Sequence, residues 1–96
     1  MLEGSGLIVP KRHAVDVFSL TPEEWIDTQE LLMKAKAYLE KLYGHDGYSV
    51  GWNTGKAGGQ SILHAHLHVI PRFADELYSG KGIRYWLKQG DNRGRV

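Results

Sequence analysis

The sequence contains no cysteine, and this absence excludes disulfide bonds, thiolate catalysis and cysteine-ligated metal sites. It also has no excess of one charge, because twelve Lys and Arg residues face eleven Asp and Glu residues. A net charge of +1 argues against binding nucleic acid through bulk electrostatics. No apolar run approaches the roughly 18 residues of a membrane-spanning helix, and no signal-peptide pattern is present. We therefore expect a globular cytoplasmic protein without nucleic-acid or membrane partners.

The chain of 96 residues is the size of one small domain. It shows neither an internal repeat nor a linker, so we expect a single domain over residues 1–96. Its core should span about residues 4–73, with a C-terminal extension at 74–96. A chain of this length buries only about 60–65% of the surface that its unfolded form exposes. We therefore expect modest stability unless a partner contributes.

A long helix is predicted over about residues 21–43. Thr21, Pro22 and Glu24 form a helix start, in which Thr21 is the N-cap, Pro22 takes the first helical position and Glu24 completes a capping box. Apolar side chains then recur with a helical period and predict one broad buried face, made of Trp25, Leu31, Leu32, Ala35, Tyr38, Leu39 and Leu42.

Three segments are predicted to be strands. Leu7 to Val9 is a short apolar run closed by Pro10 and predicts a buried strand. Residues 48–52 alternate as a strand does, a glycine-rich connection follows at 53–59, and the next strand is predicted from about Ser61 to Pro71. This order predicts an α+β fold in which a small antiparallel sheet packs on one long helix.

Three of the five histidines alternate with apolar residues in His64-Ala65-His66-Leu67-His68. On a strand, alternate side chains point to the same face, so the three imidazoles should project one way and the apolar residues the other. Three histidines on one face give no packing advantage. The pattern therefore favours a functional site.

Two chemistries could use such an array. Neutral imidazoles are common zinc ligands, and a neighbouring pair could hold a metal. However, His64 and His68 would lie about 13 Å apart along a strand, which makes a three-histidine metal site on one strand awkward. Alternatively, one imidazole could act as a covalent nucleophile while its neighbours supply protons and orientation. This second chemistry needs neither a metal nor a cofactor.

Four polar and glycine residues, Gly58-Gly59-Gln60-Ser61, precede the histidines and favour the second chemistry. Glycine-rich backbone can curl into an anion-binding nest, and Ser61 can donate to a phosphate oxygen or to a leaving group. Phosphate-binding donors beside three imidazoles would make a coherent site for phosphoryl chemistry.

The segment from Gly59 to Arg72 closely resembles the signature of the histidine-triad (HIT) proteins, which is His-x-His-x-His followed by apolar residues. Three further features extend the resemblance to about residues 4–73. Leu7 to His13 resembles the family's strand-to-turn segment, the predicted helix lies where the family has its main helix, and Asn53 lies where the family has a polar residue near the nucleotide. Within the family, the sequence resembles the nucleotide hydrolase and transferase branch, of which the diadenosine polyphosphate hydrolases are members.

The resemblance implies a nucleotide hydrolase or transferase that cleaves a phosphoanhydride or phosphoramidate, as in diadenosine polyphosphates or adenosine phosphoramidates. It implies that His66 attacks the α-phosphorus and forms a nucleotidyl-histidine intermediate. His64 and Ser61 would line the leaving-group side, and His68 would contact the phosphate or brace the site. Gln60 and Asn53 would hold phosphate or ribose oxygens, and His13 would support the triad.

The resemblance also concerns partners. HIT proteins usually carry further strands and a short helix before the segment that Leu7 begins, and we expect this wall of the nucleotide pocket to be missing here or supplied by a partner. HIT relatives are commonly dimers, and Ile26, Met33 and Ala37 form a second apolar stripe on the predicted helix. We therefore expect a homodimer through residues 21–43. A metal-dependent hydrolase and a non-catalytic nucleotide-binding module remain the alternatives.

Overall fold

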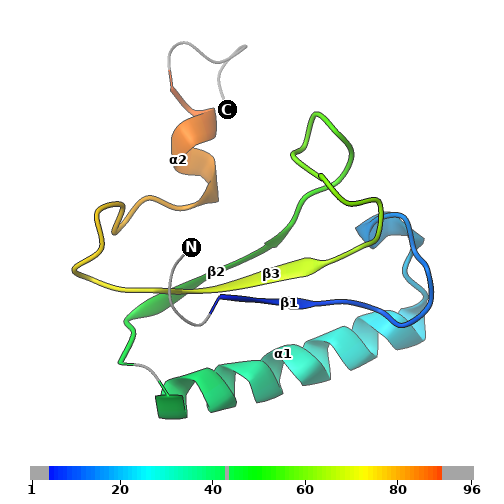
Figure 1. The fold of residues 1–96 in the computed structure, drawn as a ribbon, viewed down its shortest axis with the longest axis horizontal. Coiled ribbons are helices and arrows are strands. Elements are labelled where there is room, and N and C mark those ends of the chain that lie inside the picture. Colours follow the sequence, from blue (N-terminus) through cyan, green and yellow to red (C-terminus); the bar gives the residue numbers. More distant parts are fainter. Residues whose placement is uncertain (1–4, 43, 90–96) are drawn as a thin grey trace.

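The computed structural model describes residues 5–42 and 44–89, and these form an antiparallel sheet with a long helix against one face. The three strands are β1 (Gly6–Ile8), β2 (Gly47–Trp52) and β3 (Leu67–Arg72). Their order is β1-β3-β2, so β3, which follows the histidines, lies in the centre (Figure 1). The predicted α+β fold is confirmed.

The long helix α1 (Pro22–Leu42) begins with the predicted capping box. The Thr21 backbone N–H donates to Glu24 Oε1 at 2.8 Å, and the Glu24 N–H donates to Thr21 Oγ1 at 3.2 Å. These two bonds satisfy backbone donors that the first helical turn leaves without partners. Residue 43, the last of the predicted helix, lies outside the described residues.

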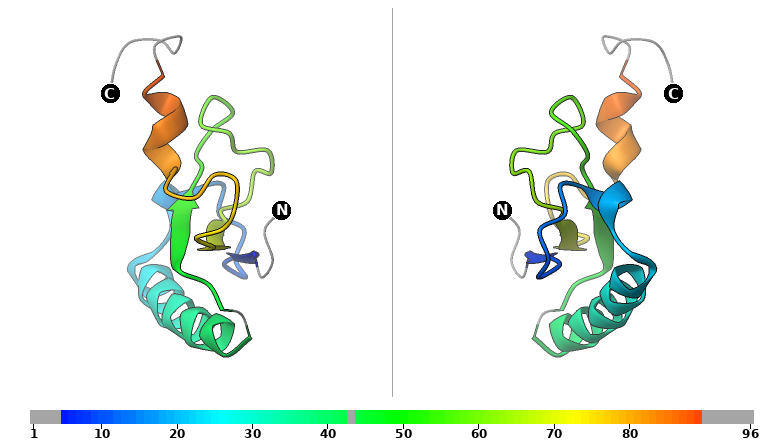
Figure 2. Two further views of the ribbon diagram at one scale, coloured as in Figure 1. Left: turned by 90° about the vertical axis from the view of Figure 1, so that its left-hand side faces the viewer. Right: turned by 90° about the vertical axis from the view of Figure 1, so that its right-hand side faces the viewer.

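The alternation of β3 separates an apolar face from a polar one. Leu67, Val69 and Pro71 are buried, and the first two pack with Ile8 and Leu39 in the core beneath the sheet. His68, Ile70 and Arg72 alternate with these residues and face the other side. In Figure 2, α1 lies against one side of the sheet, and the short helix α2 (Ile83–Leu87) and the 53–66 loop lie on the other.

The predicted broad face of the helix is mostly uncovered. Only Leu39 of its seven residues is buried, and Leu32 is partly buried against the core. The other large members of that face are exposed, namely Trp25, Leu31, Tyr38 and Leu42. The prediction of a fully buried face was wrong, because a helix of 21 residues is longer than three short strands can cover.

Two strand predictions also need correction. The first strand is one residue earlier than predicted, and it buries only Ile8, because Leu7 and Val9 point away from the core. The strand expected from Ser61 begins only at Leu67, so His64 and His66 lie in the loop before β3. The loop replaces strand pairing there because its backbone bonds to another segment, as when the Ala65 N–H donates to Ala14 O at 2.7 Å.

The C-terminal extension contains turns and then α2, which the sequence did not predict as a helix. Tyr85, Trp86 and Leu87 all lie on α2. Trp86 packs edge-on against Tyr78. The start of the predicted core at residue 4 and the end of the extension at 90–96 lie outside the described residues. Within residues 5–42 and 44–89, no helix has the length and apolar character needed to cross a membrane.

Candidate active site

The loop between β2 and β3 begins with a tight turn at the glycine-rich segment. Gly55 and Gly59 have positive φ angles of 74° and 91°, which glycine adopts without steric cost. The N–H groups of Gly58 and Gln60 both donate to Gly55 O, and that of Gly59 donates to Lys56 O. The expected anion-binding nest is therefore not formed by these three amides, because the turn uses them internally.

Gln60 fixes this loop to the rest of the protein. Its side chain is only 6% exposed, and its Oε1 accepts from the Gly55 N–H at 2.9 Å. Its Nε2 donates to Val15 O at 2.6 Å and to Ile62 O at 2.9 Å, so both amide hydrogens are used. The expectation that Gln60 holds substrate oxygens does not fit this arrangement, in which the amide braces the loop.

His64 is held by the segment that follows β1. Its Nε2 lies 3.0 Å from Pro10 O, and a carbonyl only accepts, so Nε2 carries the proton and donates. Its ring stacks on that of His13, with centroids 5.5 Å apart and planes at 26°. The structure thus brings His13 to His64, although 51 residues separate them in the sequence.

His66 is buried, and a backbone carbonyl fixes its tautomer. Its Nδ1 lies 2.8 Å from His64 O, and the residue is 8% exposed. Because the carbonyl accepts, Nδ1 carries the hydrogen, and the neutral ring then has its lone pair on Nε2. An imidazole oriented in this way presents one nitrogen as a nucleophile or base.

His68, on β3, completes the row. Its ring lies edge-on to that of His66, with centroids 5.0 Å apart. Within the part of the chain that the structure describes, His68 Nε2 is buried and has no hydrogen-bond partner. Buried ring nitrogens are usually satisfied, so one beside a buried imidazole indicates a position that a ligand can occupy.

Two other predicted residues lie at the edges of this cluster. Asn53 is exposed at the end of β2 and lines a hollow together with His68. Ser61 is exposed in the loop between Gln60 and His64. The polar residues expected at the site therefore lie in one region. Gln60 differs from Asn53 and Ser61 because its amide oxygen and both amide hydrogens already bond to backbone groups of the chain.

Sequence reasoning did not find two arginines that hold the site in place. The Arg12 guanidinium bonds to both carboxylate oxygens of Glu24 and to the carbonyl of Ser19, which ties the segment around His13 to the start of α1. The Arg12 hydrogen bond, with that of the Thr21 N–H, lowers the pKa of Glu24 to about 2. The sequence does not reveal such contacts, because their partners are far away along the chain or are backbone carbonyls, which every residue has.

Arg72, the last residue of β3, is the second. Its guanidinium bonds to Glu76, Ser49 Oγ, Lys81 O and Tyr78 O, so its donors are engaged within the protein. The same hydrogen bond from Arg72 lowers the pKa of Glu76. Arg72 therefore pins the C-terminal extension to the centre of the sheet.

A metal site was the main alternative for the histidines. Within residues 5–42 and 44–89, no three His, Cys, Asp or Glu side chains are grouped so that they could hold a metal ion. One nitrogen each of His64 and His66 bonds to a backbone carbonyl. The arrangement thus offers oriented imidazoles for proton and phosphoryl transfer.

Comparison with known protein families identifies the family of this chain. The sequence model of the HIT domain matches residues 1–75. The chain belongs to the HIT family. The fold agrees, because a HIT family protein from Bacillus anthracis superposes with a TM-score of 0.72 at 33% identity, over 76% of this chain and 52% of that one.

Some relatives of this chain are uncharacterized HIT-like proteins, and others are named by an enzymatic activity. An uncharacterized HIT-like protein of Mycoplasma genitalium is 34% identical over 95% of this chain and 62% of its own length. A bis(5′-adenosyl)-triphosphatase of Dictyostelium discoideum is 35% identical over 75% of this chain and 48% of its length. An adenosine 5′-monophosphoramidase of Schizosaccharomyces pombe is 32% identical over 83% and 57%. The chain thus spans about half to two thirds of the length of these relatives.

Proposed function

We propose that this HIT protein is a nucleotide hydrolase or transferase that cleaves a phosphoanhydride or phosphoramidate at the α-phosphorus, with His66 as nucleophile. The observation that carries the proposal is the bond from His66 Nδ1 to the His64 carbonyl. In the neutral form of this buried ring, the bond leaves the lone pair on Nε2, which is the atom that would attack phosphorus. The names of two relatives, a triphosphatase and a phosphoramidase, support cleavage of these two kinds of bond, a phosphoanhydride and a phosphoramidate.

The reaction has two steps. His66 Nε2 forms a bond to the α-phosphorus while the bond from phosphorus to the leaving group breaks, and the leaving group takes the electron pair and a proton. Water then attacks the phosphorus of the nucleotidyl-histidine, releases the nucleoside monophosphate and restores the neutral ring. Splitting one displacement into two is the usual advantage of covalent catalysis.

Neighbouring residues orient and stabilise this chemistry. His64 positions His66 through its carbonyl, and Pro10 O and His13 hold the His64 ring in turn. The free Nε2 of His68 and the amide of Asn53 would contact the phosphate or ribose, and Ser61 would donate to the leaving group. Gln60 acts indirectly, by holding the loop that carries Ser61, His64 and His66.

The test uses labelled diadenosine tetraphosphate and adenosine phosphoramidate, with release of AMP as the readout. We expect turnover by the wild type of at least one substrate. His66→Ala should lower kcat by several orders of magnitude, on the order of what removing a nucleophile costs in other covalent enzymes. His64→Ala should cost less, because the backbone carbonyl that orients His66 remains.

The same assay decides between the alternatives. Activity that disappears with a chelator and returns with zinc would favour a metal-dependent hydrolase. Nucleotide binding without turnover in the wild type would favour a non-catalytic binding module. Turnover that resists chelators and depends on His66 would support the covalent mechanism.

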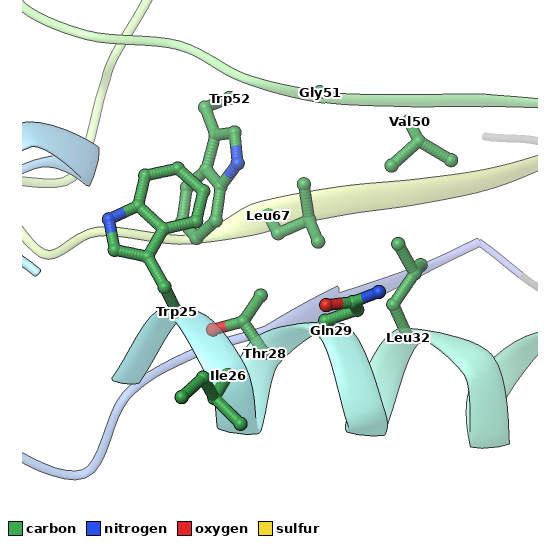
Figure 3. Close-up of a pocket in the computed structure, with 9 residues that line it drawn as sticks. All are labelled: Trp25, Ile26, Thr28, Gln29, Leu32, Val50, Gly51, Trp52 and Leu67. Atoms are coloured by element: carbon green, nitrogen blue, oxygen red, sulfur yellow. The ribbon is translucent and has the colours of Figure 1, made fainter. Parts of the chain in front are cut away.

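We also propose that the protein forms a homodimer through α1. Ile26, Met33 and Ala37 form the second stripe of the helix and are exposed, with Met33 at 59%. An apolar hollow of about 430 Å³ lies between α1 and β2, and Figure 3 shows Trp25, Leu32 and Trp52 pointing into it. In the described sheet β2 is an edge strand, so apolar surface and unpaired backbone lie side by side. A second copy would cover both.

A further inference from the structure

Residues 77–89 expose large apolar and aromatic side chains on the surface of the protein. None of the five residues of α2 is buried, although four of them are large and apolar or aromatic. Leu77, ahead of the helix, is 83% exposed, and Ile83, at its start, is 61% exposed. The exposed side chains, here called the α2 patch, are those of Leu77, Tyr78, Ile83, Tyr85, Trp86 and Leu87. Scattered apolar residues on a surface are ordinary, but a patch of them marks an interaction site.

The α2 patch is held in a fixed position. The Trp86 ring lies edge-on to that of Tyr78, with centroids 5.5 Å apart, and to that of Tyr85, with centroids 4.8 Å apart. Arg72 donates to the carbonyls of Tyr78 and Lys81, which ties the chain before α2 to the centre of the sheet. In Figure 1, α2 projects from the side of the sheet opposite α1. The patch is therefore a protruding surface on a firm base.

The charges around the patch all have one sign. Lys81, Arg84 and Lys88 lie within residues 77–89, and this segment contains no Asp or Glu. Lys81 Nζ lies 5.1 Å from the centre of the Tyr85 ring, so this cation sits directly beside the aromatic surface. The acid that precedes the segment, Glu76, forms an ion pair within the protein. This local excess of positive charge favours an anionic partner.

The combination of apolar side chains and cations fits the surface of an anionic lipid bilayer. Trp and Tyr prefer the boundary between headgroups and acyl chains, and Lys and Arg are attracted to anionic headgroups. A single-stranded nucleic acid would use the cations and rings, but it would gain nothing from the exposed aliphatic Leu77 and Ile83. A second copy of the patch is a poor partner, because a two-fold contact would bring like charges together.

We propose that the α2 patch is a peripheral membrane-binding site for anionic phospholipid. Ile83 and Trp86 enter the bilayer at the level of the headgroups, while the three neighbouring cations contact lipid phosphates. The sequence-based expectation of no membrane partner rested on net charge and on the length of apolar runs, and neither describes a local surface. One short patch gives reversible binding that weakens as salt rises. The proposal does not depend on the chemistry proposed for His66.

The first test is flotation of the full chain with vesicles of phosphatidylcholine alone or mixed with an equal amount of phosphatidylglycerol. The wild type should bind the mixed vesicles and not the neutral ones, and added salt should weaken binding. Arg84→Glu combined with Lys88→Glu should lower the partition coefficient at least about tenfold. The matched control is Lys34→Glu combined with Lys41→Glu, which makes the same charge change at exposed positions of α1. The control should bind as the wild type does.

The second test asks whether the patch enters the bilayer, and it needs no charge variant. Lipids brominated in the acyl chain quench the fluorescence of nearby tryptophan. Mixed vesicles made with these lipids should quench part of the wild-type emission, and Trp86→Phe should lose that quenched part. The other tryptophans that the structure describes, Trp25 and Trp52, line the hollow beside α1 and should not be quenched.

The outcomes decide the proposal. It would be overturned if the wild type did not float with the mixed vesicles, if the α1 control lost binding as much as the α2 variant, or if binding left Trp86 unquenched. Binding of single-stranded RNA that requires Arg84 and Lys88, without flotation, would assign the surface to nucleic acid instead. Salt-sensitive flotation that requires the same two cations, together with quenching of Trp86, would support the membrane site.

Discussion

The loop that carries His64 and His66 and the helix α1 differ in how far the chain itself satisfies their side chains. In the loop, polar groups find partners over long sequence distances, as Gln60 does with Val15 and His64 with Pro10. On α1, large apolar side chains such as Met33 and Tyr38 remain exposed. The Gln60, His64 and His66 side chains are therefore held by bonds within the chain, while the helix beside them is not covered.

The difference indicates which part of the protein would be stabilised by a second molecule. Bonds to backbone carbonyls orient His64 and His66 without help from any other molecule. The apolar surface of α1 gains stability only when something covers it. We therefore expect substitutions in the loop to lower the stability of the single chain. Substitutions in the stripe of α1 should instead weaken the association of two chains.

The largest effect on stability should come from Gln60→Leu. This change removes three hydrogen bonds of a buried amide, which it makes to backbone groups of Gly55, Val15 and Ile62. At 0.5–1.5 kcal/mol per bond, the free energy of unfolding should fall by about 2–4 kcal/mol, measured by urea denaturation. AMP release should fall with it, because the loop positions His66.

The matched control is Gln29→Leu, the same substitution at an exposed position on α1, measured at a protein concentration too low for association. Its free energy of unfolding should stay within about 0.5 kcal/mol of the wild type. Equal stability of the two variants would mean that the Gln60 amide does not hold the loop.

A smaller effect is expected from Met33→Lys, which places a charge in the centre of the exposed stripe. The wild type should be a dimer at tens of micromolar by light scattering, and the variant should be a monomer. Because association stabilises the folded state by mass action, the variant should also melt at a lower temperature at high protein concentration. Glu23→Gln, which changes the net charge equally at the start of the helix, should still dimerise. A monomeric wild type would show that the stripe is ordinary surface.

The smallest effect should come from acid titration of the Arg12–Glu24 pair. The Arg12 hydrogen bond lowers the pKa of Glu24 from its ordinary value of 4.5 to about 2. The stabilisation is therefore fully present above pH 4.5 and is lost as the pH falls towards 2. Glu24→Gln should unfold less steeply than the wild type in this window, followed by circular dichroism, and the two curves should run parallel above it. Identical slopes below pH 4.5 would exclude the pair as a source of acid sensitivity.

The sequence predicted those elements whose signals are local. The capping box at Thr21 and Glu24 and the alternation of apolar residues around Leu67 lie within a few residues of the structures that they specify. The start of β3 was predicted six residues too early, because alternation continues through His64 and Ala65 although their backbone bonds elsewhere. Strand pairing depends on a partner that periodicity does not reveal.

The candidate site divides in the same way. The histidine motif identified the region, but the sequence could not show that the Gln60 amide is consumed by the fold or that His64 O orients His66. Every residue has a backbone carbonyl, so the contacts with Pro10 O and Val15 O do not appear as a motif in the sequence. For the same reason, the approach of Ile83 to Gly51 becomes visible only when both positions are placed in space.

The most direct test of the central claim is to find the atom that carries the nucleotide during turnover. The protein is mixed with adenosine phosphoramidate or diadenosine tetraphosphate, quenched in base within milliseconds to seconds, digested and analysed by mass spectrometry. We expect an adenylyl group on His66, absent in His66→Ala and retained in His68→Ala at reduced yield. Turnover of substrate with no adduct on any histidine, or with the adduct on His64 or His68, would contradict the assignment of His66 as the nucleophile.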